Sequence, residues 1–444
     1  MLVKKIIFRL WPIGILIRTI SLVLFFCTHI SMASIANTNS VVAIKTPNNF
    51  SAFSELLIVN PAPRIQLQFP YSFINTDYAT VTIATGGTGF AGPTGTATAN
   101  LVSLVTTTAT GSSALLSSNR RLHYKPGQGS VCEFTAIYGA GIANNNQIVG
   151  IGNSSDGFFY GYNGTLFGIL WRSSSSGSLV NTWISQANWN VDGMNGSGPS
   201  GITLNPQTGN LYKIQFAWLG FGVINFYIAN PNGSGWILVH QIQYPNNFIN
   251  SSVLNASMQL YAQTINTAAA GSIQTLKVCS MAGMTEGFTD EIEDVRNSIS
   301  TITAQNTPAP ATNPTNVLAI QNQTTFNGKT NQVRVLLDAI SLLNTAGGGN
   351  NARVDLYLNP TLSGTLTYTP INTTGSVVQF STTSVTVTSG KLLMSFYCDT
   401  QTAVTFDLDS YNIVLNPGDV LVIAGQGQGG TATMFASLTW SEGF

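Results

Sequence analysis

The sequence predicts an all-β protein with two β-sandwich domains, of jelly-roll or lectin-like type, joined by a short helix and a Pro/Thr-rich linker. Three observations support this. Apolar and polar residues alternate in short runs that Gly, Pro and Asn interrupt, which is typical of antiparallel strands. A chain of 444 residues exceeds one ordinary domain. Charged residues are 8% and hydrophobic residues 44%, which favours folded cores over disorder.

The same composition narrows the function classes. The formal net charge is zero, and no basic run lies outside the N-terminus. Nucleic-acid binding, which needs clustered Lys and Arg, is therefore not expected. A surface rich in Ser, Thr, Asn, Gln and Gly suits coats, fibres and repetitive assemblies, because neighbouring copies repel one another little.

Residues 1–36 are predicted to be a signal peptide, an uncleaved anchor or an extension of the reading frame ahead of Met32. A basic start precedes the apolar run Ile20–Cys27, and small residues follow it. The run is short for a spanning helix of roughly 20 residues. Membrane contact is expected only through this segment, if it stays uncleaved. The basic residues are Lys4, Lys5, Arg9 and Arg18.

Residues 40–287 are predicted to form the N-terminal β-sandwich. Arg64–Phe69 alternates, and Thr80–Thr110 is rich in β-branched Thr and in Gly turns. Five of the seven tryptophans fall between Arg120 and Asn246, and they are expected to pack the core. Aromatic residues can also stack on sugars, and the residues we predict to contact carbohydrate are Tyr160, Tyr162, Trp183 and Trp189.

Residues 288–316 are predicted to be a helical neck and linker. Thr285–Gln305 has a capping box, with Asp290 followed by Glu293 three residues later. Its apolar residues recur at spacings of four and three, a pattern that favours trimers when isoleucine fills it. The helix either trimerises or lies on its own domain. Asn306–Asn316 then predicts an extended linker. The oligomerisation residues would be Ile292, Val295, Ile299 and Ile302.

Residues 317–444 are predicted to form the C-terminal β-sandwich. Short strand-like runs are separated by turns such as Asn416–Asp419, and about eight strands in such a length fit one sandwich. The predicted strands are Val333–Leu337, Arg353–Leu358, Val377–Phe380, Ser384–Val387, Leu392–Tyr397, Ala403–Leu408, Val420–Ala424 and Met434–Trp440.

Two parts of the chain resemble β-rich surface and fibre structural proteins of tailed phages and large DNA viruses. FSAFSELLIVNPAPRIQLQFPY at Phe50–Tyr71 and RRLHYKPGQG at Arg120–Gly129 carry the first resemblance, which covers residues 50–287. Residues 317–444, ending in ASLTWSEGF, resemble the C-terminal sandwich domains of virion proteins. The resemblance implies a structural or adhesive role on a particle surface, often in oligomers, and no catalytic triad.

The sequence contains no recognisable catalytic constellation. Glycosidases need two carboxylates roughly 5 to 9 Å apart, whereas Glu133, Asp156 and Asp192 stand isolated. His240 is expected to be a hydrogen-bonded strand histidine. No metal or cofactor is predicted. Arg120, with Arg121, His123 and Lys125, forms a small basic cluster that either is solvated or meets an anionic glycan or a neighbouring subunit.

The leading hypothesis is a non-enzymatic virion structural protein, such as a fibre, spike or decoration subunit at the virion surface. It would act by assembly and adhesion, with further copies of itself in a homotrimer, other virion proteins and host surface glycans as partners. A second hypothesis is a secreted or surface-anchored carbohydrate-binding protein. The third is a polysaccharide-degrading enzyme, which the missing carboxylate pair disfavours.

Overall fold

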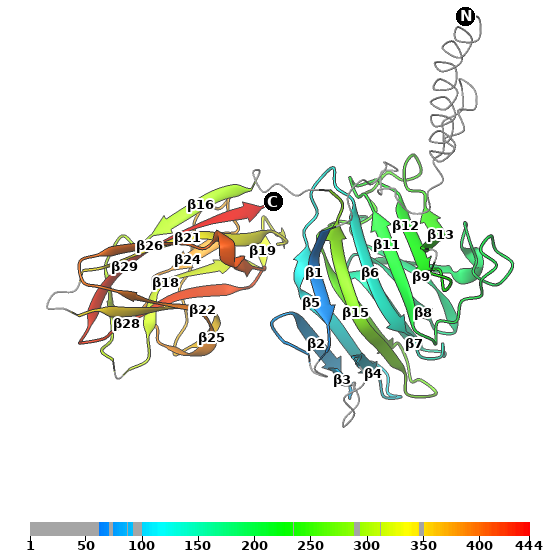
Figure 1. Cartoon of the computed structure of the whole chain (residues 1–444), viewed down its shortest axis with the longest axis horizontal. Coiled ribbons are helices and arrows are strands. Elements are labelled where there is room, and N and C mark those ends of the chain that lie inside the picture. Colours follow the sequence, from blue (N-terminus) through cyan, green and yellow to red (C-terminus); the bar gives the residue numbers. More distant parts are fainter. Residues whose placement is uncertain are drawn as a thin grey trace, which may run out of the picture.

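The structure, a computed structural model, describes residues 62–70, 74–86, 88–91, 100–233, 235–287, 294–310, 312–345 and 350–444. Every named strand pair is antiparallel, and these residues contain no α-helix; their helical turns are the 3₁₀ segments η1 (Gln186–Asn188) and η2 (Asp409–Tyr411). Among them, no helix has the length and apolar character needed to cross a membrane. The all-β prediction is confirmed, and Figure 1 shows two β-rich bodies. The predictions for residues 1–36 lie outside the described residues.

The N-terminal sandwich consists of two sheets with one apolar core drawn from both. The β6 sheet has the order β13-β12-β11-β6-β15-β4-β3, with β1 beside β15, and the β8 sheet has the order β10-β9-β8-β7-β14-β5-β2. The β6 sheet contains β1 (Ala62–Gln68), β3 (Thr88–Ala91), β4 (Val102–Val105), β6 (Ser130–Ile137), β11 (Asn210–Phe216), β12 (Ile224–Ala229), β13 (Trp236–Ile242) and β15 (Thr275–Thr285). The β8 sheet contains β2 (Ala79–Ala84), β5 (Ser113–Leu122), β7 (Asn145–Gly152), β8 (Gly157–Asn163), β9 (Leu166–Ser173), β10 (Val180–Ser185) and β14 (Met258–Asn266).

Close backbone approach within the β8 sheet requires glycine at Gly161. A Cβ atom built there would collide with the carbonyl oxygen of Gln147 on β7. We expect Gly161→Ala to lower the free energy of unfolding by about 1–3 kcal/mol, since the strands must move apart. Thermal melting measures this. Gly271→Ala is the control, because a Cβ there meets nothing within 4 Å; equal melting temperatures for the two variants would contradict the prediction.

The C-terminal sandwich also consists of two sheets. The β29 sheet has the order β16-β29-β21-β26, with β17 beside β29 and β27 beside β21, and the β28 sheet has the order β23-β24-β18-β28-β22-β25. The β29 sheet contains β16 (Val295–Ser300), β17 (Gln305–Thr307), β21 (Arg334–Asn344), β26 (Ala403–Asp407), β27 (Val414–Leu415) and β29 (Ala432–Gly443). The β28 sheet contains β18 (Thr315–Asn322), β22 (Ala352–Leu362), β23 (Thr369–Pro370), β24 (Val378–Ser381), β25 (Val387–Cys398) and β28 (Val420–Gly427), and a hairpin joins β19 (Thr325–Phe326) to β20 (Lys329–Thr330).

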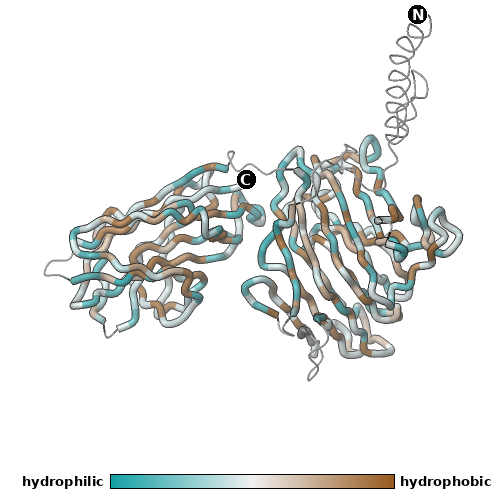
Figure 2. The backbone as a smooth tube through the Cα atoms, in the orientation of Figure 1, coloured by the Kyte–Doolittle hydropathy of each residue, from teal (hydrophilic) through white to brown (hydrophobic). Residues whose placement is uncertain are grey.

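The local strand predictions hold well in this second sandwich. Arg353–Leu358, Val420–Ala424 and Met434–Trp440 fall inside β22, β28 and β29. Figure 2 shows apolar stretches along the strands and polar stretches in many of the connecting loops, as the alternation requires. The core between the sheets includes Trp440, which is fully buried.

The helical neck is a wrong prediction for the residues that the structure describes. Val295–Ser300 forms strand β16, antiparallel to β29 at the end of the chain. Val295 is 47% exposed and Ile302 is 95% exposed, while Ile299 packs against the core of its own sandwich. β-branched residues favour strands, and the edge of β29 offers unpaired hydrogen-bonding groups, so pairing prevails over the helical spacing. Ile292 lies outside the described residues.

The predicted linker is likewise part of the second sandwich. Gln305–Thr307 forms β17, which pairs with β29, and Thr315 already begins β18. The second sandwich therefore includes residues before 317, beginning with Val295. A homotrimer stays a prediction, and β16 provides no helix to support it.

Candidate functional site

Three of the four predicted carbohydrate contacts are core residues. Tyr160, Tyr162 and Trp189 are 0%, 7% and 7% exposed and belong to the core between the two sheets. The Tyr160 ring lies 4.9 Å from Tyr212 and 6.0 Å from Trp189, and its hydroxyl donates to the carbonyl oxygen of Tyr227. These side chains cannot reach a surface ligand, so the prediction is wrong for them. Strand β8 is buried on both faces, and alternation alone does not tell which face is covered.

Trp183 lies on the outer face of the β8 sheet. It packs, half-buried, against a separate apolar cluster that contains Phe159, Leu170 and Tyr261. The guanidinium of Arg172 lies 5.3 Å from the centre of the Phe159 ring. Trp183 is therefore the member of the predicted set that lies outside the central core, but its ring mainly covers neighbouring apolar side chains.

A small pocket that the sequence did not indicate lies where the β9–β10 hairpin meets the loop between β13 and β14. We call it the aromatic pocket; its volume is about 160 Å³. Trp171, Tyr244, Phe248 and the highly exposed Ile249 supply its apolar side. Among the residues that the structure describes, no charged side chain lines it. The polar lining residues are Ser173, Ser175, Ser176, Thr182 and Asn250.

Hydrogen bonds hold the aromatic rings of this pocket in place. The indole Nε1 of Trp171 donates to the carbonyl oxygen of Ser252 at 2.6 Å, and the Tyr244 hydroxyl donates to that of Asn250 at 2.6 Å. Phe248 stacks on Tyr244 with ring centres 4.2 Å apart and planes 11° apart. Because the polar edges are satisfied internally, the rings are available for apolar contact only.

Buried Asp156 joins the two walls of the aromatic pocket. Its carboxylate accepts hydrogen bonds from the backbone N–H and the hydroxyl of Ser174 on one wall and from the backbone N–H of Leu254 on the other. Asp156 therefore has a structural role. Asp192 has a similar one, since it accepts from the backbone N–H groups of Met194 and Ser200.

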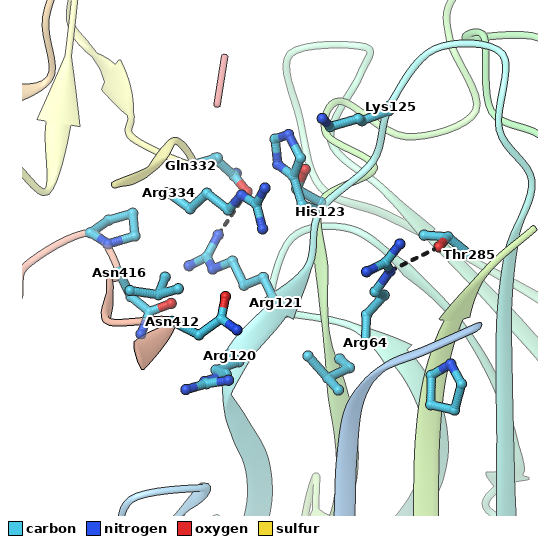
Figure 3. A pocket seen from close by; sticks show the side chains of 15 residues that line it. Arg64, Arg120, Arg121, His123, Lys125, Thr285, Gln332, Arg334, Asn412 and Asn416 are labelled. Carbon is cyan, nitrogen blue, oxygen red and sulfur yellow. Dashed lines mark hydrogen bonds between the residues drawn. The ribbon is translucent and has the colours of Figure 1, made fainter. Parts of the chain in front are cut away.

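A second candidate site is a basic cavity between the two sandwiches, of about 230 Å³ (Figure 3). Arg64, Arg120, Arg121, His123 and Lys125 come from the N-terminal sandwich, while Gln332 and Arg334 come from the C-terminal one. The fold thus brings the predicted basic cluster together with Arg64 and Arg334, which are distant from it in the sequence. Five of the chain's 17 Lys and Arg residues line this cavity.

Polar contacts tie the walls of this cavity together. The Nη1 of Arg121 donates to Gln332 Oε1 across the domain boundary at 2.7 Å, and Arg64 Nε donates to Thr285 Oγ1 at 3.2 Å. Asp294 pairs with both Lys125, at 3.8 Å, and Arg334, at 3.6 Å. Burial lowers the pKa of Arg121.

A larger cavity of about 710 Å³ adjoins the basic one and shares Arg120 and Arg121 with it. Among the described residues, its lining includes five amide side chains, three Ser or Thr hydroxyls, the carboxylates of Asp77 and Asp419 and the exposed ring of Tyr411. Lys391 of the second sandwich pairs with Asp77 of the first across it, at 2.8 Å. We call the two cavities together the interdomain cleft. The amide residues are Asn119, Gln259, Asn359, Asn412 and Asn416.

Two further titratable side chains that the sequence singled out have structural partners. His240 accepts a hydrogen bond from the backbone N–H of Asn190 through Nδ1, and burial lowers its pKa to about 4, so the strand-histidine prediction is confirmed. Glu133 pairs with Lys213 at 3.7 Å. Within the described ranges, no group of three or more His, Cys, Asp and Glu side chains is arranged to hold a metal ion.

Comparison with known proteins gives fold-level likeness only. No protein-family model and no curated protein matches the chain, so the resemblance to virion proteins stays a prediction. An endo-β-1,4-glucuronan lyase from the fungus Trichoderma reesei is similar at 9% identity over 50% of this chain and 95% of its own, with a TM-score of 0.33. A glycosyl hydrolase family protein from Mycobacterium fortuitum has 11% identity over 51% of this chain and all of its own, with a TM-score of 0.32. The carbohydrate recognition domain of Emp47p has 8% identity over 50% of this chain and 95% of its own, with a TM-score of 0.29. Scores this low carry no functional argument.

Proposed function

We propose that this protein binds carbohydrate without cleaving it and that the aromatic pocket is a site for an uncharged sugar. One observation carries the proposal: a stacked pair of aromatic rings, with Phe248 outermost, faces hydroxyl and amide groups in a pocket whose described lining contains no charged side chain. Small-molecule sites combine apolar walls with a few placed polar groups in this way. A sugar ring matches them, because it has apolar C–H faces and hydroxyls around its edge.

Binding would follow from the geometry of the two walls. Phe248 offers an exposed ring face, and its stacking on Tyr244 fixes its orientation. The hydroxyls of Ser173 and Ser175 hydrogen-bond each other at 2.9 Å, so one of the two can donate to a sugar hydroxyl while both, with Thr182, can accept. Because Asp156 already joins the walls, little ordering is needed on binding, and preorganisation of this kind favours affinity.

Truncation of the outer ring tests this proposal. We expect Phe248→Ala to weaken binding of a neutral oligosaccharide, found by screening a glycan panel, by a factor of at least about 10, or about 1.4 kcal/mol. Isothermal titration calorimetry measures the change. Phe444→Ala is the control, since Phe444 is 59% exposed against 44% for Phe248 and does not line the pocket.

Three outcomes would contradict the proposal. The first is that no neutral glycan in the panel binds. The second is that the two Phe variants lose affinity equally, and the third is that the protein releases reducing sugars from a bound glycan. The last result would show an enzyme, and Asp and Glu substitutions that abolish the release would then identify its acids.

The setting that we propose is the surface of a virus particle, with other copies of this chain and other virion proteins as partners and host glycans as ligands. The sequence resemblance and the charge-poor composition support this setting. Secretion or surface anchoring by a cell is the alternative. Proteomics of purified particles distinguishes the two, and sedimentation of the native protein as a monomer would remove the support for a fibre.

A further inference from the structure

We propose that the interdomain cleft binds a second kind of ligand, an oligosaccharide that carries carboxylate or sulfate groups. The basic cavity would hold the acidic group, and the adjoining larger cavity would hold the sugar rings. This proposal goes beyond the aromatic pocket and does not depend on it, because the two sites share no lining residue.

The charge at the basic end points to an anionic group. Arg120 and Arg121 line both cavities and so stand at their junction. Arg120 makes no ion pair within the described part of the chain. Arg121 uses Nη1 for Gln332, and its other guanidinium N–H groups are further donors. The planar guanidinium fork matches carboxylate and sulfate oxygens, and such charge-assisted hydrogen bonds are among the strong ones.

The setting of these cations strengthens the argument. In a chain with only 8% charged residues, five Lys and Arg side chains and His123 surround a cavity of about 230 Å³. Such a concentration of cations in a chain this poor in charge favours an acidic group at this place on the surface. Asp294 already pairs with Lys125 and Arg334, so we assign the acidic group of the ligand to Arg120 and Arg121.

The larger cavity has the chemistry of a saccharide site. Its volume of about 710 Å³ lies in the range of small-molecule pockets. Amide side chains such as Asn412 can both donate and accept hydrogen bonds, as sugar hydroxyls require, while Asn119 and Gln259 already donate to the backbone carbonyls of Thr76 and Ser118. Tyr411 adds an exposed ring at its edge. A chain of sugar rings lying there would present its acidic group to Arg120 and Arg121.

Titration of the full-length protein at low ionic strength tests the proposal. The probes are a uronate-containing oligosaccharide, a sulfated oligosaccharide, a neutral oligosaccharide of equal length and inorganic sulfate. The titrations use the Phe248→Ala variant, which lacks the outer ring of the aromatic pocket, and we expect one or both acidic oligosaccharides to bind at least tenfold more tightly than the neutral one and than inorganic sulfate. Raising the salt concentration should weaken this binding, because exposed charges are screened.

Matched variants locate the site. Arg120→Gln should weaken binding of the acidic oligosaccharide at least tenfold, and Arg121→Gln should do the same. Lys277→Gln removes one positive charge on β15 outside both cavities and should leave the affinity unchanged. The proposal is overturned if the neutral oligosaccharide binds the Phe248→Ala variant as well as the acidic ones do, if only inorganic sulfate binds, or if the Lys277 variant loses as much affinity as the Arg120 variant. None of these results would contradict the proposal for the aromatic pocket, since that proposal is tested separately by comparing Phe248→Ala with the unchanged protein on a neutral sugar.

Discussion

Glu442→Ala is expected to lower the free energy of unfolding of the second sandwich by about 2–6 kcal/mol. Glu442 is fully buried near the end of β29. Its carboxylate accepts hydrogen bonds from the backbone N–H of Val377 at 2.8 Å and from the indole Nε1 of Trp440 at 2.8 Å. Both donors are fixed in the core, and each costs about 1–3 kcal/mol when it is left unsatisfied.

The same carboxylate also connects separate strands. It accepts from the hydroxyl of Ser376, before β24, and from the side-chain amide of Asn297 on β16. Glu442→Gln should lower the free energy of unfolding less than the Ala variant does, because one oxygen still accepts hydrogen bonds. Some cost remains, because the new NH₂ group faces donors. Urea unfolding followed by Trp fluorescence measures both changes.

Asp399→Ala is the control for this network. Asp399 is an exposed carboxylate of the same sandwich, and its loss should change stability by no more than about 0.5 kcal/mol. If the Glu442 and Asp399 variants unfold at the same urea concentration, the buried network does not carry the stability assigned to it.

Tyr160→Ala is expected to destabilise the first sandwich by about 3–5 kcal/mol, the usual cost of truncating a large buried aromatic residue. The Tyr160 ring contacts Tyr212, Phe226 and Trp189 between the two sheets. Tyr160→Phe removes only the hydrogen bond to the Tyr227 carbonyl and should cost about 1 kcal/mol. Chemical unfolding of each variant measures these effects.

This prediction separates a core role from a ligand-binding role. Tyr397→Ala is the control, since that ring is 69% exposed and its loss should change stability by about 0.5 kcal/mol or less. The folded fraction of the Tyr160→Phe variant should bind the neutral sugar with unchanged affinity. Unchanged stability together with lost sugar binding in the Tyr160 variants would show that the ring contacts a ligand.

The local residue pattern was enough to predict the strands, because successive side chains of a strand point to opposite faces and the apolar residues therefore alternate in the sequence. Arg353–Leu358 and Met434–Trp440 alternate and lie in strands β22 and β29. At Thr285–Gln305 the local pattern gave a wrong prediction, because apolar residues spaced three and four apart indicated a helix. Whether Val295–Ser300 forms a helix or a strand depends on the edge of β29, which lies more than a hundred residues later in the sequence.

The candidate sites show the same division. The cluster from Arg120 to Lys125 is visible in the sequence as a group of basic residues. Arg64 and Arg334 join it only because the strands and the packing of the two sandwiches bring them to one cavity. The aromatic pocket gave no sequence signal, since Trp171 and Phe248 are far apart and their neighbours are ordinary Ser and Asn.

By itself, then, the sequence determined that this protein is built of strands, that it forms two sandwiches and that it carries little charge. The tertiary structure alone decided which aromatic rings are buried, that residues 295–307 complete the second sandwich, and which side chains share a cavity. The physical reason is that alternation is a local property of the backbone. Burial and site geometry depend instead on strand pairings and packing between residues distant in sequence.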